Sequence, residues 1–166
     1  AGILAGAFLH QAGTVLGRRQ YRDLSLRVLE YSLVRQEPSG AWAYSFAGKV
    51  PRKRQYDFHQ VYMLDAISAY GDELPTKLFT KAKEARARGT AFYLDRMFDR
   101  QLRPYWRYPW RWPTDIHNVS HAVYFLSKHG RECGNDVDGR LTKLLDLLLG
   151  PFYNEEGRCF YYQMYG

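Results

Sequence analysis

Two Asp–His pairs at matching positions are the residues of this chain most suited to chemistry. The string D-F-H-Q-V at residues 57–61 returns as D-I-H-N-V at residues 115–119. Each copy opens an apolar stretch with helical spacing, so each pair stands where a helix begins. A carboxylate there can act as general acid or base on a sugar, and an imidazole beside it can pass a proton. The candidate catalytic residues are therefore Asp57, His59, Asp115 and His117.

The same residues have a purely structural interpretation, which the sequence leaves open. An Asp at a helix start accepts the free amide hydrogens of the first turn, which is worth about 1 kcal/mol. The positive end of the helix dipole favours an ionised carboxylate, which suits a base or a nucleophile better than an acid. Histidines near that end can equally be partly buried side chains bonded to backbone or to a neighbouring loop.

The loop at 98–114 interleaves aromatic and basic residues. Aromatic rings stack on sugar rings, and arginines pair with carboxylates or phosphates. We predict substrate contacts from Trp106, Arg107, Trp110, Arg111 and, on the helix after His59, Tyr62. Alternatively, the aromatic rings fill gaps between helices and the arginines stack over them. The basic run R-K-R at 52–54 lies in the equivalent loop one repeat earlier and is either a second basic rim or a solvated charge run.

Several other kinds of site find little support. His121 lies one turn after His117, and such a pair can bind a metal, but no H-E-x-x-H string is present. P-loop, dinucleotide, serine-nucleophile and catalytic-cysteine motifs are absent as well. Single-stranded nucleic acid would use the aromatic and basic ingredients of the loop, yet no recognised nucleic-acid motif accompanies them. We predict no metal, no cofactor and no nucleic-acid partner.

The spacing of apolar residues predicts an all-α chain of three tandem α/α hairpins within one partial domain. We expect hairpin repeats at approximately 1–56, 57–114 and 115–166, each with an inner helix, an outer helix and an aromatic loop. The predicted helices cover residues 1–16, 18–35, 57–70, 77–97, 115–128 and 141–149. No strand pattern competes with them. Three hairpins expose apolar faces at both ends, which self-association or further hairpins would cover.

Composition narrows the class of partner. The formal net charge of +7 fits an anionic partner, which can be an acidic glycan, a nucleic acid or a membrane surface. The 14 Tyr and 4 Trp suit carbohydrate stacking and equally the joints between helical repeats. Cys133 and Cys159 lie far apart and are predicted to be ordinary reduced thiols. No apolar run reaches the ~18 residues of a membrane span, so we expect a cytoplasmic protein. The chain begins without Met inside an apolar pattern, from which we expect a piece of a longer protein.

One motif resembles a repeat of known helical enzymes. The string Q-E-P-S-G-A-W at residues 36–42 resembles the Q-x-x-x-G-x-W repeat of prenyltransferases and squalene cyclases, which are α/α toroids. In those proteins the motif tethers helices rather than doing chemistry. An isoprenoid-handling enzyme is therefore a weaker alternative, and it would need an acidic D-x-D-D cluster that this sequence does not contain.

A wider resemblance covers most of the chain. The resemblance is to an α/α-toroid family from bacterial polysaccharide-biosynthesis loci. It is carried by Y-D-F-H-Q-V-Y-x-L at 56–64, Y-P at 108–109 and P-x-D-I-H at 113–117. The pattern is similar also to the six-hairpin toroids of uronic-acid hydrolases, lyases and sugar epimerases. The chain departs from that pattern at Tyr56, Gln60 and His121. The resemblance implies part of a toroid, about half of a ring. It also implies a carbohydrate-active or glycan-binding protein of bacterial surface-polysaccharide biosynthesis, acting on an acidic or lipid-linked glycan as a hydrolase, lyase or epimerase. The alternative is a non-catalytic helical-repeat scaffold that binds a protein or glycan.

Overall fold

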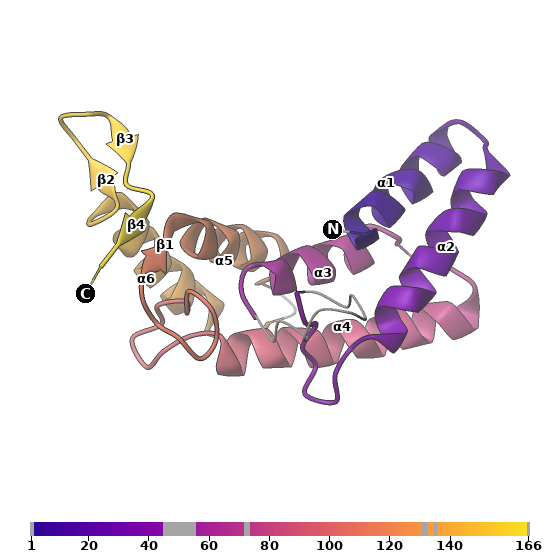
Figure 1. Cartoon of the computed structure of the whole chain (residues 1–166), viewed down its shortest axis with the longest axis horizontal. Helices are drawn as coiled ribbons and strands as arrows, with labels where there is room; N and C mark the ends of the chain where they lie inside the picture. Colours follow the sequence, from indigo (N-terminus) through magenta and orange to yellow (C-terminus); the bar gives the residue numbers. More distant parts are fainter. Residues whose placement is uncertain (1, 45–55, 72–73, 131–132, 135, 166) are drawn as a thin grey trace, which may run out of the picture. The chain divides into compact units, whose positions relative to one another are not determined.

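The computed structural model describes residues 2–44, 56–71, 74–130, 133–134 and 136–165, and these are mostly helical. Figure 1 shows the six helices of the described residues, which are α1 Gly2–Val15, α2 Arg19–Val34, α3 His59–Ser68, α4 Thr76–Arg96, α5 Ile116–His129 and α6 Val137–Leu149. All six predicted helices are present, so the helical class is confirmed. The arrangement of three tandem hairpins as part of an α/α toroid stays a prediction. None of these helices combines the length and apolarity that a membrane crossing requires.

Four short strands were not predicted. Strand β1 (Thr114–Asp115) pairs antiparallel with β4 (Gln163–Met164), and β2 (Tyr153–Asn154) pairs antiparallel with β3 (Cys159–Phe160). Each strand has two residues, which is too short to produce a detectable alternation of apolar and polar positions. Their importance lies in β1, because it contains the Asp115 of the second motif.

The chain divides into two compact units. Unit 1 comprises Ala1–Ala43 and Tyr62–Phe92, and unit 2 comprises Tyr44–Val61 and Tyr93–Gly166. Boundaries between the units fall within α3 and α4.

In unit 1, glycines let α1 and α2 approach closely, and the two helices lie side by side in Figure 1. A Cβ atom at Gly6 would lie 2.6 Å from Val28 Cγ1, and one at Gly13 would lie 2.9 Å from Arg22 Cγ. These glycines therefore bring the backbones of α1 and α2 close together. The other face of α1 leaves large apolar side chains exposed, among them Phe8 and Val15, as expected for a terminal hairpin.

The motif at 36–42 ties α2 to α4 within unit 1, and we call Gln36, Gly40 and Trp42 the clasp. Gln36 Nε2 donates to the carbonyl oxygens of Gly40 (3.0 Å) and Ala85 (2.7 Å). Trp42 Nε1 donates to the carbonyl oxygen of Ser32 at 2.9 Å. Gly40 has a φ of +93°, and a Cβ there would collide with the backbone carbonyl of Arg88. The expectation that this motif tethers helices is confirmed.

Unit 2 is built on α5 and α6. The side chains of Val119, Phe125, Leu144 and Phe152 are fully buried or nearly so. Tyr93 packs edge-on against Phe125 with ring centroids 5.3 Å apart, and burial, with a smaller effect of Cys133, raises its pKa. Helix α6 begins at residue 137, four residues before the predicted start, although Gly139 lies in its first turn. Cys133 and Cys159 are both free thiols, as predicted.

Candidate functional site: two Asp–His dyads in unit 2

Both Asp–His pairs fold into the same local structure. Asp57 Oδ1 accepts hydrogen bonds from the backbone N–H of His59 (3.0 Å) and from its Nδ1 (2.6 Å). Asp115 Oδ1 accepts from His117 N–H (2.8 Å) and from its Nδ1 (2.9 Å). We call these the first dyad and the second dyad. Because an ionised carboxylate can only accept, each Nδ1 carries a proton, and Nε2 is the basic nitrogen of the neutral imidazole.

Burial separates the roles of the two members of each dyad. Asp57 and Asp115 are buried, at 3% and 5% exposure, whereas the imidazole side chains of His59 and His117 are 31% and 46% exposed. A buried carboxylate that already holds a helix start and a ring cannot also meet a ligand. The carboxylates therefore cap and orient, and the imidazoles are the groups that a ligand can reach.

The ring of Phe58 joins the two dyads. It stacks on His59 with ring centroids 4.5 Å apart and on His117 with centroids 5.7 Å apart. A third imidazole, His121, stacks on it at 5.3 Å. Burial lowers the pKa of His121, and the nearby charges that His117 and His59 carry when protonated lower it further. The imidazoles of His59 and His117 thus stack on the same apolar ring. The third imidazole on that ring, His121, favours its neutral form.

Short backbone ladders position the starts of both motifs. The residue before Asp57 is Tyr56, whose carbonyl accepts from the N–H of Tyr108 at 2.8 Å in an isolated antiparallel bridge. The residue before Asp115 is Thr114, which pairs with Met164 in β4. In each case the segment just before the Asp pairs with the aromatic loop that follows the next outer helix. The equivalence of the two motifs therefore extends to their surroundings.

Aromatic and polar side chains surround each imidazole. Tyr44 meets His59 edge-on with ring centroids 4.5 Å apart, and Tyr162 meets His117 edge-on at 5.4 Å. Gln163 Nε2 donates to Asp115 Oδ2 at 2.9 Å, which occupies the second oxygen of that carboxylate. Both tyrosines are about half exposed or more, so rings of aromatic surface flank the accessible imidazoles.

The predicted ligand loop is divided between internal contacts and exposed surface. The Arg107 guanidinium lies over the Trp106 ring at 4.0 Å, and Arg111 pairs with Asp99 (3.0 Å) and donates to Gln101 Oε1 (3.1 Å). Trp110 remains 61% exposed. The structural interpretation thus accounts for Arg111, while the Trp110 ring is available to a partner.

Two predicted features lie outside this site. Tyr62 is a half-buried residue of unit 1, whereas both dyads belong to unit 2. The basic run at 52–54 lies outside the described residues. Among the residues that the structure describes, no group of three His, Cys, Asp or Glu side chains is arranged to hold a metal ion.

Phe58, Tyr162 and Gln163 are site residues that the motif search did not single out. Phe58 lies between the Asp and the His of the first motif, where the second motif has Ile116. A search for repeated residues therefore does not select it. Tyr162 and Gln163 reach the second dyad through the β1–β4 pairing, which carried no readable sequence signal. The one sequence feature that pointed to Tyr162 and Gln163 was the aromatic run at the end of the chain.

Comparison of the chain with protein-family models, with curated proteins and with solved structures finds no match in any of the three.

Proposed function

We propose that unit 2 is a glycan-binding site in which His59 and His117 transfer protons to and from the bound sugar. One observation carries this proposal. Two imidazoles, each oriented by a buried carboxylate through Nδ1, present their other edge beside a single apolar ring. When a carboxylate orients the protonated ring nitrogen of a neutral imidazole, the other nitrogen is the basic one that can accept a proton.

The aromatic surface around the dyads favours a carbohydrate as the ligand. Tyr44, Trp110 and Tyr162 keep 49%, 61% and 62% of their surface exposed. Such rings offer flat apolar faces to the C–H groups of sugars and polar edges to their hydroxyls. The formal net charge of +7 favours an acidic sugar over a neutral one.

The burial of the carboxylates bears on the type of reaction. Hydrolysis by the usual route needs two carboxyl groups that face the scissile bond. Asp57 and Asp115 are buried and already bonded, so that route has less support than proton abstraction by an imidazole. Of the three classes considered from sequence, elimination and epimerisation fit better, because both begin with removal of a proton next to a carboxylate in a uronic acid.

The assignment to bacterial surface-polysaccharide biosynthesis and to a larger α/α toroid rests on the motif resemblance alone. It agrees with the helical fold and with the tethering role of the clasp. The substrate in this proposal is an acidic glycan, free or lipid-linked.

The test combines a binding assay with product analysis. Wild-type protein is applied to an array of acidic and neutral oligosaccharides, and each ligand that binds is incubated with the protein and examined by mass spectrometry and NMR. The variants His59→Asn and His117→Asn keep an amide donor for the Asp while removing the proton-transfer group. We expect both to retain most glycan binding and to abolish turnover.

Matched aromatic variants localise the binding surface. Tyr162→Ala removes a ring at the second dyad, and Tyr31→Ala removes a similarly exposed ring on α2. We expect Tyr162→Ala to weaken binding and Tyr31→Ala to leave it unchanged. Binding without any product would favour the scaffold alternative, and absence of binding to every glycan would overturn the proposal.

A further inference from the structure

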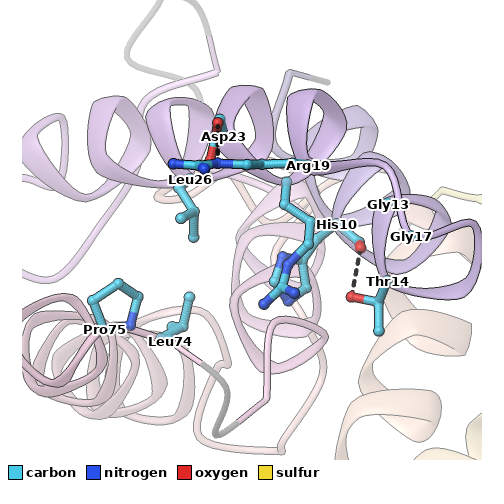
Figure 2. Close-up of a pocket in the computed structure, with 10 residues that line it drawn as sticks. His10, Gly13, Thr14, Gly17, Arg19, Asp23, Leu26, Leu74 and Pro75 are labelled. Carbon is cyan, nitrogen blue, oxygen red and sulfur yellow. Dashed lines mark hydrogen bonds and ion pairs between the residues drawn. The ribbon is translucent and has the colours of Figure 1, made fainter.

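Unit 1 contains a groove that is unrelated to the dyads of unit 2. It has a volume of about 570 Å³ and lies between the turn that joins α1 to α2 and the segment that precedes α4. Figure 2 shows His10 and Thr14 on one side of it and Leu74 and Pro75 on the other. Both ends of the lining therefore belong to one unit, and the groove is a property of that unit alone.

Helix α2 lines the groove with two arginines and one aspartate, Asp23. Arg19 and Arg22 both line it from α2, and residues three apart on a helix lie on the same face. Arg19 lies 3.6 Å from Asp23, but the two side chains are 93% and 61% exposed. An ion pair with that exposure is weak because water screens it, so it competes poorly with an incoming anion. Guanidinium groups bind carboxylates and phosphates through paired hydrogen bonds.

The residues that line the groove include a buried histidine whose hydrogen bonds fix its orientation. His10 is 5% exposed, and its Nδ1 lies 3.3 Å from Ser25 Oγ. Ser25 Oγ donates its single proton to the carbonyl of Arg22 at 2.7 Å, so Nδ1 of His10 must be the donor in the first contact. The ring of His10 also packs against Tyr70, with centroids 4.9 Å apart. Through Ser25 the buried imidazole is thus connected to the backbone that carries Arg22.

The rest of the lining includes apolar residues. Leu26, one turn beyond Arg22 on α2, lines the groove together with Leu74 and Pro75. A ligand that satisfies both the arginines and the apolar residues must carry an anionic group and an apolar body. A fully hydrated inorganic ion would meet only the arginines.

We propose that this groove binds a small organic oxyanion, a phosphate monoester or a carboxylate, with its charge at Arg19 and Arg22 and its apolar part against Leu26 and Leu74. The site is independent of the glycan site proposed above, since no residue is shared. Failure of one proposal therefore leaves the other standing.

The test uses simple probes on the whole chain. Phenyl phosphate and benzoate each carry an oxyanion on a ring, inorganic phosphate lacks the ring, and phenol lacks the charge. We expect saturable binding of phenyl phosphate or benzoate by calorimetry, with inorganic phosphate and phenol at least about tenfold weaker, since each loses one of the two kinds of contact. The backbone amide signals of Gly13 and Gly17 should shift in NMR titrations, because both residues line the groove.

Charge-removing variants supply the decisive comparison. Arg22→Gln and Arg19→Gln should each weaken phenyl phosphate binding about tenfold, the loss expected for one charge-assisted contact. Arg27→Gln, an exposed arginine of α2 that does not line the groove, should leave the affinity unchanged. The proposal is overturned if no probe saturates, or if Arg27→Gln weakens binding as much as Arg22→Gln does. Equal binding of all probes, phenol included, would also overturn it.

Discussion

The clasp and the Asp–His dyads are the two motifs that stand out in this sequence, and they use hydrogen bonds in opposite ways. In the clasp, Gln36 and Trp42 direct their donors to backbone carbonyls inside unit 1. In the dyads, the carboxylates are buried in the same manner, but the imidazoles remain 31% and 46% exposed. A motif whose polar atoms are all directed inward stabilises a fold. One that leaves an oriented polar edge in solvent is available for binding or chemistry.

Substitution of Gly40 should give the largest loss of stability. Gly40→Ala places a side chain at a φ of +93° and against the carbonyl of Arg88, so strain and steric overlap add to about 3 kcal/mol. Urea unfolding monitored by circular dichroism measures this loss. Gly17→Ala is the matched control, because Gly17 also has a positive φ but open space around it, and it should cost only about 1 kcal/mol. Equal losses in the two variants would contradict the clasp.

Removal of the second carboxylate should come next. Asp115→Ala leaves the start of α5 uncapped and removes the partner of the half-buried Gln163 amide, for an expected loss of about 2 kcal/mol. Asp115→Asn retains the capping oxygen, so its loss should stay below about 1 kcal/mol. Thermal unfolding of the two variants checks this difference. If Asn is as damaging as Ala, the charge of Asp115 matters to the fold more than its capping bond does.

The sequence indicated the helices more directly than the contacts between distant segments. Periodic apolar residues revealed α1 to α6, because a helical period extends over many positions. Contacts such as the hydrogen bond from Gln36 to Ala85 join residues far apart in sequence and leave no local pattern. The early start of α6 was missed because a polar turn with two glycines reads as a loop.

The sequence indicated candidate residues for the site but not how they are arranged. The repeated motif identified Asp57, His59, Asp115 and His117, yet equivalence alone gave no reason to expect that both imidazoles meet one ring. That meeting depends on Phe58, which only one copy possesses. Whether the pairs would cap or react was left open, and burial assigned capping to the carboxylates and accessibility to the imidazoles.

Burial of His121 should make the stability of the protein depend on pH. The pKa of His121 is lowered in the folded state, so the unfolded chain binds the proton more readily. The stabilising contribution is complete above about pH 6.5, the ordinary value, and is lost as the pH falls through the lowered folded pKa. His121→Phe should reduce the loss of stability on going from pH 7 to pH 5. An unchanged difference between these two pH values would show that burial of this imidazole does not govern the acid sensitivity.

The smallest effect on stability should come from the exposed imidazoles themselves. His59→Asn and His117→Asn keep a donor for the capping carboxylates and remove a ring that is partly in solvent, so each should change the free energy of unfolding by no more than about 0.5 kcal/mol. The double variant should show additive losses if the dyads are separate caps. A departure from additivity of more than about 0.5 kcal/mol would instead reveal coupling through the shared Phe58 ring. Phe58→Leu separates these cases, since it removes the shared ring and should abolish any coupling while both Asp–His bonds remain.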